Sequence, residues 1–331
     1  MANSIDRCPA AVPLAYQTSL AKGVNCSHSC VGIVAVKLPP VAGEEARLRS
    51  TVWLITGSAS GLGRDIAEAA LAAGKQVVAS ARRPEELQDL VERYKEGRRA
   101  VRQDVTNSEE ADAAVARAIQ AFGRLDVLVN NAGYAQFALF EQMSAGDFKG
   151  IIDACFHGVV NTTRAALPVM RKQRSGVIFQ VSSVGARVTR PGNSPYHAAK
   201  WAVSGFAEAL AQEASVFGVQ VCALEPGVIR TNWAKRANSA APRLLAEYEE
   251  NVGNAIRVLA NYWGQENSDP KLIADLIVNL AEENALPPHL LLGSDAYAIS
   301  TRADDAQREL SEKWRETGES VDFRGVPGAY K

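Results

Sequence analysis

The chain has 331 residues, of which 47% are hydrophobic, and a formal net charge of -1 at pH 7. This length allows one large hydrophobic core or two domains, and the near-neutral charge gives no electrostatic reason to expect binding to nucleic acid or to an anionic membrane. No apolar run approaches the roughly 18 residues that a membrane span needs. The five cysteines are too few for a disulfide scaffold, so a reducing, cytoplasmic location is expected.

Residues 1–50 differ in character from the rest of the chain. They show little periodicity, and they lack the charged and apolar regions of a secretory signal. Cys26 and Cys30 have no second ligand pair at zinc-site spacing, so we expect no metal site there. We interpret residues 1–50 as a poorly ordered N-terminal extension, or as a consequence of where translation was assumed to begin.

From Thr51 onward, short β-branched runs alternate with alanine-rich helical stretches. Continuous apolar strands separated by helices indicate a parallel sheet that is covered by helices on both faces. We therefore predict an α/β fold in which residues 51–331 form a single Rossmann-type, doubly wound domain. The predicted strands are Val52–Thr56, Gln76–Ala81, Ala100–Asp104, Leu125–Asn130, Gly176–Ser182, Val219–Leu224 and Leu290–Leu292, and the clearest helical segments are Gly63–Ala73, Ala111–Phe122 and Trp201–Phe217.

The segment Thr56–Gly63 leaves the first predicted strand and opens the first helix. Its glycines allow the backbone to approach a pyrophosphate closely, and the helix N-terminus supplies free N–H groups and a positive dipole end. A glycine-rich turn alone is a weak signal, because turns collect glycine for steric reasons. Its position between a strand and a helix favours dinucleotide binding over a purely structural turn.

The end of the second predicted strand indicates which dinucleotide is bound. NAD-binding folds typically place an acidic residue there, whereas this strand is followed by Arg82 and Arg83, with no carboxylate before Glu85. An arginine at this point can pair with a 2′-phosphate. We therefore predict NADP(H) as the cofactor; the alternative is that both arginines are solvated loop residues.

Tyr196 and Lys200 form a second chemical motif. Ser194 reads as a helix N-cap and Pro195 as the first helical residue, which puts Tyr196 and Lys200 at positions i and i+4 on one face. A free tyrosine has a pKa of about 10, and a lysine cation and an oxidised nicotinamide would both favour the tyrosinate. Tyr196 is therefore predicted to give a proton to a carbonyl oxygen, or to take one from an alcohol. Ser183, at a strand end, would hold the same oxygen.

These motifs together resemble the short-chain dehydrogenase/reductase family over about residues 51–296. Thr56–Gly63 matches the family's TGxxxGxG turn, Asn130–Gly133 its NNAG element, and Ser183 with Tyr196 and Lys200 its Ser…Tyr-x-x-x-Lys set. The C-terminal part is similar to reductases of microbial and fungal secondary metabolism. The resemblance implies Ser183, Tyr196 and Lys200 as catalytic residues, no metal, and cofactor contacts from Gly57, Ser60, Gly61, Leu62, Gly63, Arg82, Asp104, Asn131, Arg164, Tyr196, Lys200, Ile229 and Thr231.

Cys155 departs from the family pattern, because relatives have an asparagine at this position. In the family this asparagine helps to hold a water of a proton relay, partly through its backbone carbonyl. A cysteine keeps the carbonyl and loses the amide, so we expect weakened proton exchange rather than loss of activity. A reactive thiol is the alternative, although a buried helix cysteine is usually inert packing.

Residues 232–270 follow the last cofactor motif and are rich in aromatic residues and leucine. We predict that they form a substrate lid suited to a medium-sized apolar or aromatic substrate; helix packing or a dimer face is the alternative. The predicted function is an NADP(H)-dependent oxidoreductase that interconverts a small-molecule alcohol with a ketone or aldehyde. Both a monomer and a homo-oligomer are compatible with the sequence. A dinucleotide-binding regulatory protein with weakened catalysis, or a non-redox enzyme on the same fold, remains the alternative.

Overall fold

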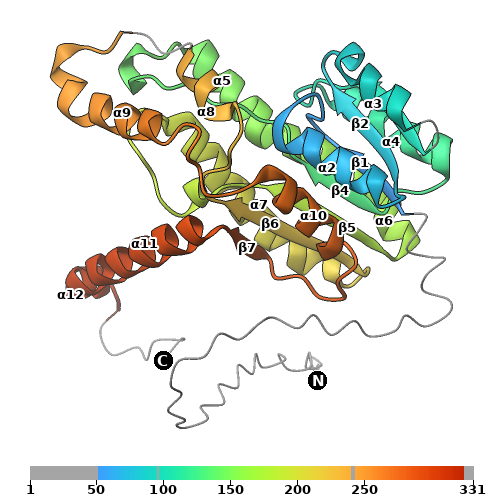
Figure 1. The fold of residues 1–331 in the computed structure, drawn as a ribbon. Coiled ribbons are helices and arrows are strands. Elements are labelled where there is room, and N and C mark those ends of the chain that lie inside the picture. Colours follow the sequence, from blue (N-terminus) through green and yellow to red (C-terminus); the bar gives the residue numbers. More distant parts are fainter. Residues whose placement is uncertain (1–50, 95–96, 240–242, 324–331) are drawn as a thin grey trace, which may run out of the picture. The chain divides into compact units, whose positions relative to one another are not determined.

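Seven short strands pair into one parallel sheet, in the order β3-β2-β1-β4-β5-β6-β7 (Figure 1). The computed structural model describes residues 51–94, 97–239 and 243–323, so the predictions for residues 1–50, Cys26 and Cys30 included, lie outside the described residues. The strand order reverses its direction between β1 and β4, as in a doubly wound sheet, and the predicted fold class is confirmed. The strands are β1 (Val52–Ile55), β2 (Gln76–Ala81), β3 (Arg98–Arg102), β4 (Val127–Asn130), β5 (Gly176–Val181), β6 (Val219–Pro226) and β7 (His289–Leu292).

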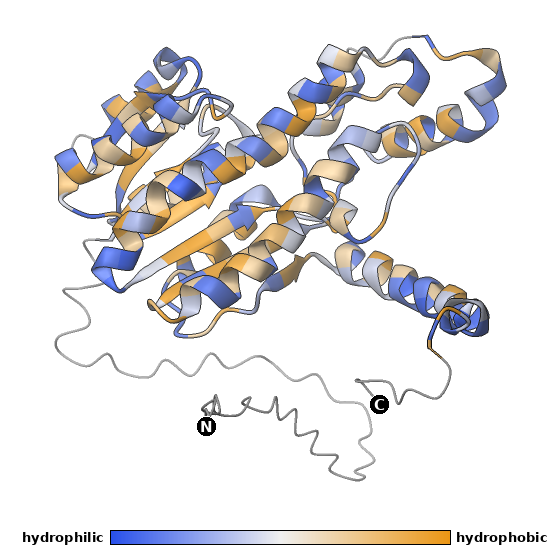
Figure 2. Cartoon of the chain, turned by 180° about the vertical axis from the view of Figure 1, so that it is seen from behind, coloured by the Kyte–Doolittle hydropathy of each residue, from blue (hydrophilic) through white to orange (hydrophobic). Residues whose placement is uncertain are grey.

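Helices cover both faces of the sheet because its central strands are apolar on both sides. In β1, Trp53 and Ile55 join one core layer and Val52 and Leu54 the other, and all four are fully buried. Figure 2 shows the strands as hydrophobic stretches between amphipathic helices. The first layer packs on α2 (Gly61–Ala72) and α10 (Pro270–Leu280), and the second on α4 (Ser108–Phe122), α6 (Gly158–Gln173) and α7 (Ser194–Ser215).

The remaining helical elements lie around this three-layer body. Among the described residues they are η1 (Pro84–Leu87), α3 (Gln88–Arg93), η2 (Phe140–Gln142), α5 (Ala145–Ile152), η3 (Asp153–His157), η4 (Val184–Ala186), α8 (Trp233–Ser239), η5 (Ala246–Tyr248), η6 (Glu249–Gly253), α9 (Asn254–Asn261), α11 (Ser294–Lys313) and α12 (Arg315–Glu319). Within the described ranges, no helix has the length and apolar character needed to cross a membrane.

Several predicted boundaries differ from the structure: β4 begins at Val127 rather than Leu125, for example, and α7 begins at Ser194 rather than Trp201. Strand β3 begins at Arg98 and ends at Arg102, two residues before the predicted end at Asp104. Strand β3 lies at the edge of the sheet and its side chains are partly solvated, so arginines are tolerated there. The apolar pattern that located the other strands is therefore weak in β3, and its predicted bounds are misplaced. Helix α7 has Asn193 as its N-cap residue, because the backbone of Ser194 is already helical.

Candidate active site

A cavity of about 980 Å³ opens where the carboxyl ends of the central strands meet. The turn after β1, the segment after β4, the loop after β5, helix α7 and the segment after β6 all line it. A cavity at this edge of a doubly wound sheet is where such folds bind their ligands. The predicted site residues that line it are Gly57, Ser60, Gly61, Leu62, Arg82, Asp104, Asn131, Ser183, Tyr196, Lys200, Ile229 and Thr231.

The glycine-rich turn has the backbone that a pyrophosphate site requires. Gly57 and Gly61 have φ angles of +68° and +60°, in the left-handed region that favours glycine. A Cβ atom at Gly63 would collide with the amide of Asn131 and the carbonyl of Gly57, so Gly63 is needed for close packing rather than for lining the cavity. Helix α2 starts at Gly61, and Ser60 makes no side-chain capping bond, so its first N–H groups stay available for an anion.

Asn131 ties the turn after β1 to the segment after β4. Its side-chain Nδ2 donates to the carbonyl of Thr56 at 2.9 Å and to that of Gly57 at 3.3 Å, and its backbone N–H donates to the Thr56 hydroxyl at 2.9 Å. These bonds hold the floor of the cavity rigid before any ligand binds. The sequence pattern predicts that Asn131 contacts the cofactor, and its bonds show that it holds the glycine-rich turn in place.

The two arginines after β2 have different surroundings. Both arginines line the cavity, but Arg83 pairs with Glu86, whereas Arg82 forms no ion pair within the described part of the chain. Asp104 lines the same end, where its Oδ1 accepts hydrogen bonds from the backbone and hydroxyl of Thr106 at 3.0 and 2.8 Å. This end therefore offers one unpaired guanidinium beside an ordered carboxylate. A phosphorylated ribose and its base fit that donor and acceptor set.

The structure does not bring Arg164 to the cavity, which corrects its predicted cofactor contact. Arg164 is exposed on α6, while the neighbouring Thr163 points into the core and accepts a hydrogen bond from Asn130 at 2.9 Å. Successive helix residues are rotated by about 100°, so a buried Thr163 turns Arg164 toward solvent.

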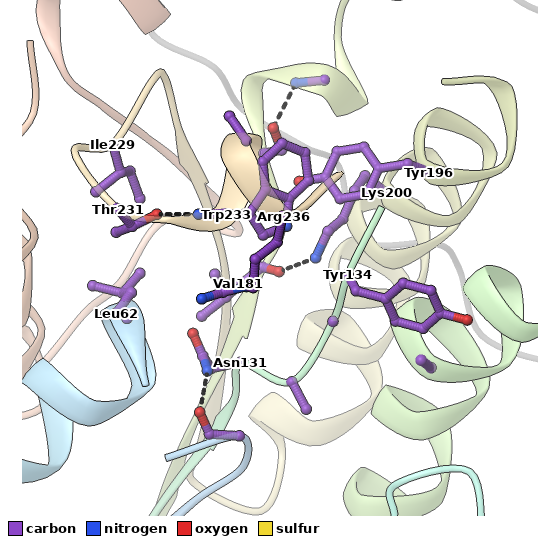
Figure 3. A pocket seen from close by; sticks show the side chains of 18 of the residues that line it. Leu62, Asn131, Tyr134, Val181, Tyr196, Lys200, Ile229, Thr231, Trp233 and Arg236 are labelled. Carbon is purple, nitrogen blue, oxygen red and sulfur yellow. Dashed lines mark hydrogen bonds between the residues drawn. The ribbon is translucent and has the colours of Figure 1, made fainter. Parts of the chain in front are cut away.

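Ser183, Tyr196 and Lys200 come together on one wall of the cavity. Figure 3 shows Tyr196 and Lys200 there. The Ser183 hydroxyl lies beside Tyr196 and accepts a hydrogen bond from the backbone N–H of Gly185 at 3.0 Å. Lys200 is 4% exposed, and its Nζ donates to the carbonyl of Val181 at 2.6 Å and lies 5.6 Å from the centre of the Tyr196 ring. The three groups are thus held in fixed positions by β5 and α7.

Ser182 and Ser183 point to different sides, as strand alternation predicts. The buried Ser182 hydroxyl donates to the carbonyl of Lys200 at 3.2 Å and contacts the Ser204 hydroxyl at 2.9 Å. It therefore braces α7 against β5, and Ser183 is the serine beside the tyrosine.

The pKa values of the tyrosine and the lysine differ from the sequence-based expectation. Burial raises the pKa of Tyr196, Cys155 raises it further, and the bond to Ser183 lowers it only in part. Burial also lowers the pKa of Lys200. The protein alone therefore keeps Tyr196 protonated, and the expected lowering by Lys200 is not seen. The effect of an oxidised nicotinamide on this pKa stays a prediction.

Cys155 lies in the π-helical turn η3, between α5 and α6, and is fully buried. Such turns are frequent at functional sites. Its Sγ donates to the carbonyl of Tyr134 at 3.1 Å, and burial raises the pKa of the thiol. A Cβ atom at Gly133 would lie 3.1 Å from this sulfur and 3.9 Å from the Lys200 Nζ, so the thiol packs close to the lysine. A buried, protonated thiol argues against the reactive-thiol alternative.

The substrate end of the cavity has an aromatic wall. The ring centroids of Tyr196 and Trp233 are 5.0 Å apart, and Phe137 meets Trp233 edge-on at 6.4 Å. Trp233 and Leu259, both from the predicted lid, line the cavity. Both lie within residues 232–270, whereas Phe137 lies outside this range and was not predicted.

Three polar residues at this end were also missed: Arg190, Asn193 and Arg236 line the cavity. Arg190 and Asn193 lie in the sequence between the two motif residues Ser183 and Tyr196. This position could have predicted them, because a loop that joins two site residues stays near the site. Asn193 is 5% exposed, and its Oδ1 has no hydrogen-bond partner within the described residues. A ligand donor would satisfy that oxygen.

Comparison with known proteins agrees with this geometry. The family model for short chain dehydrogenases matches residues 51–242. Oxidoreductase BOA17 of Botryotinia fuckeliana is 44% identical over 266 residues, which are 80% of this chain and 97% of that protein. A 3-oxoacyl-[acyl-carrier-protein] reductase of Synechocystis sp. is 37% identical over 223 residues, 64% of this chain and 90% of that protein. A crystal structure of a short-chain dehydrogenase from Streptomyces avermitilis matches with a TM-score of 0.76 and 36% identity, over 83% of this chain and 100% of that one.

Fold and site together define an oxidoreductase that uses a nicotinamide cofactor. The chain belongs to the short-chain dehydrogenase/reductase family.

Proposed function

We propose that the protein uses NADP(H) to interconvert a ketone or aldehyde with the corresponding alcohol on a medium-sized apolar or aromatic substrate. The observation that carries this proposal is that Ser183, Tyr196 and Lys200 lie together in the same cavity as the glycine-rich turn. The reductase activity for which the Synechocystis relative is named agrees with it. Oxidation of NADPH, followed by absorbance with a panel of aryl ketones, tests the proposal directly.

The mechanism assigns each side chain one task. A bound nicotinamide supplies or accepts the hydride. Tyr196, protonated because burial raises its pKa, donates its hydroxyl proton to the carbonyl oxygen in reduction. Ser183 holds the same oxygen, and Lys200, fixed on the carbonyl of Val181, lies beside the tyrosine ring where it supports proton return. Trp233 and Leu259, as parts of a substrate lid, keep water from the reacting carbon.

Preference for NADP(H) follows from Arg82, whose guanidinium has no partner within the described residues, while Arg83 is held by Glu86. Replacing Arg82 with alanine should weaken NADPH binding by about 1–3 kcal/mol and leave NADH binding nearly unchanged. Fluorescence titration of both cofactors measures the ratio. The matched control is Arg83→Ala, which should change the ratio little. Equal weakening by both substitutions would contradict a specific phosphate contact.

Cys155 motivates the second candidate, a cofactor-binding protein with weakened catalysis. Because the thiol is inert and packs beside Lys200, we expect Cys155→Asn to change kcat by less than about tenfold, or roughly 1.4 kcal/mol. Its effect on alcohol oxidation should be largest below neutral pH, where Tyr196 must lose a proton. Steady-state rates from pH 5 to 9 measure this. A wild type that binds NADPH without turnover, together with an active Cys155→Asn variant, would establish the second candidate instead.

A further inference from the structure

We propose that the substrate carries a carboxylate, which Arg190 and Arg236 bind at the substrate end of the cavity. The inference rests on the proposed function and adds the chemical class of the substrate. Arg190 belongs to the loop that precedes α7, and Arg236 belongs to α8, so the two guanidinium groups come from different walls. Figure 3 shows the side chain of Arg236 pointing into the cavity.

Among the described residues, Arg190 and Arg236 line the cavity without acidic partners, as does Arg82 at the adenosine end, which the proposed function assigns to the cofactor. Within the described ranges, neither the guanidinium of Arg190 nor that of Arg236 forms an ion pair or a side-chain hydrogen bond. By contrast, Arg83 pairs with Glu86, Arg187 with Glu225, and Lys149 with Asp153. A cavity that keeps two unpaired guanidinium groups is prepared for an anion that the protein itself does not supply.

No carboxylate on the cavity wall is free to neutralise these arginines. Among the described residues, the acidic side chains that line the cavity are Glu86, Asp104 and Asp153. Glu86 is paired at the adenosine end, and Asp104 accepts both of its hydrogen bonds from Thr106. Asp153 is bound by Lys149 and His157. The substrate end therefore carries an excess positive charge, although the whole chain is nearly neutral.

Arg190 is tied to the residue next to the proton donor. Its backbone N–H donates to Nε2 of His197 at 3.1 Å, and Nδ1 of His197 contacts the carbonyl of Gly185 at 2.9 Å. Burial lowers the pKa of His197, and the charge of Arg190 lowers it further, so the ring stays neutral and can accept the Arg190 N–H. His197 follows Tyr196 on α7, and this link keeps the arginine loop at a set position relative to the tyrosine.

A carboxylate fits this arrangement better than other anions. The pyrophosphate of the cofactor has its own site at the glycine-rich turn, where Gly57 and Gly61 shape the backbone. A guanidinium binds a planar carboxylate through two parallel N–H···O bonds. The aromatic wall of Phe137, Tyr196 and Trp233 lines the same cavity as the two arginines and suits an apolar body. The substrate class is thus a keto acid, or the matching hydroxy acid, with an aromatic or apolar body.

The test compares an acid with its uncharged analogue. The reactive probes are 4-oxo-4-phenylbutanoate and its methyl ester, whose reduction is followed by NADPH absorbance. The unreactive probes are 4-phenylbutanoate and 4-phenylbutanamide, which are titrated calorimetrically into the NADP-loaded protein. We expect wild type to prefer the acid of each pair by at least about tenfold. Arg190→Gln and Arg236→Gln should each remove most of this preference while the Kd for NADPH stays unchanged. The control Arg117→Gln alters an exposed arginine of α4 and should keep the preference.

The outcomes separate this inference from the proposed function. If NADPH binds but neither ketone is reduced, the proposed function fails, and the unreactive pair still decides whether a carboxylate is recognised. Equal binding of acid and amide by wild type overturns the inference. It is also overturned if Arg236→Gln weakens NADPH while the acid preference persists, because the arginine would then serve the cofactor.

Discussion

Replacing Tyr196 with phenylalanine should lower kcat at least about 100-fold and change the Kd for NADPH less than about twofold. The substitution removes only the hydroxyl, and the ring keeps its contacts with Trp233 and His197. Ser183 loses its partner but keeps the hydrogen bond from Gly185 N–H, so the substrate oxygen can still be held without receiving a proton. Single-turnover reduction of an aryl ketone measures the chemical step, and fluorescence titration measures cofactor binding.

A matched control is Tyr297→Phe, which removes a hydroxyl from an exposed tyrosine of α11 and should leave kcat unchanged. Because burial raises the pKa of Tyr196, ketone reduction by wild type should persist into alkaline solution, whereas alcohol oxidation should increase as the pH rises toward that pKa. A Tyr196→Phe enzyme with near-normal single-turnover rates would remove this residue from the mechanism.

The sequence carries enough information for the sheet because its central strands are buried on both faces. Runs such as Val52–Ile55 and Val127–Asn130 have no polar face, so hydropathy alone locates them. Strand β3 shows the limit: as an edge strand it carries Arg98, Arg99 and Arg102, which the same criterion excludes. Edge strands are specified by backbone pairing, and β3 pairs with β2 through a register that hydropathy does not encode.

The positions of Ser183, Tyr196 and Lys200 could be predicted because their spacing is local to one strand end and one helix. The environment of Tyr196 could not be predicted from the sequence. Its raised pKa depends on burial by elements far apart in the sequence, among them Cys155 of η3 and Trp233 of α8. The unpaired state of Arg190 is equally invisible in the sequence, because it depends on where every carboxylate of the fold comes to lie.

Glu225 is the clearest buried charge that spacing could not predict. It is 1% exposed at the end of β6, where Arg187, Ser204 and His289 all contact its carboxylate. Arg187 follows the η4 turn that begins next to Ser183, and the Ser204 hydroxyl also contacts Ser182. The cluster therefore joins the catalytic loop, α7 and β7 around one anion.

Replacing Glu225 with glutamine should lower the free energy of unfolding by about 2–3 kcal/mol, less than for a fully buried pair because Arg187 and His289 are partly exposed. Glu208→Gln is the matched control: Glu208 also contacts His289, at 3.2 Å, but its side chain is 56% exposed, so its loss should change stability by less than about 1 kcal/mol. Urea denaturation of the three proteins measures both differences.

The pH dependence of that difference identifies the charges involved. Burial alone would raise the pKa of Glu225, but the bonds from His289 and Arg187 outweigh burial and hold this pKa below its usual 4.5. The stability that the ionised Glu225 contributes is therefore present above pH 4.5 and is lost as the pH falls through the lowered pKa. The bond to Glu225 raises the pKa of His289 above its usual 6.5, so that contribution is complete below pH 6.5 and is lost as the pH rises through the raised value. The stability gap between wild type and Glu225→Gln should therefore be widest between pH 4.5 and 6.5 and narrow on both sides. A gap independent of pH would mean that packing, and not this charge cluster, holds the catalytic loop against β6.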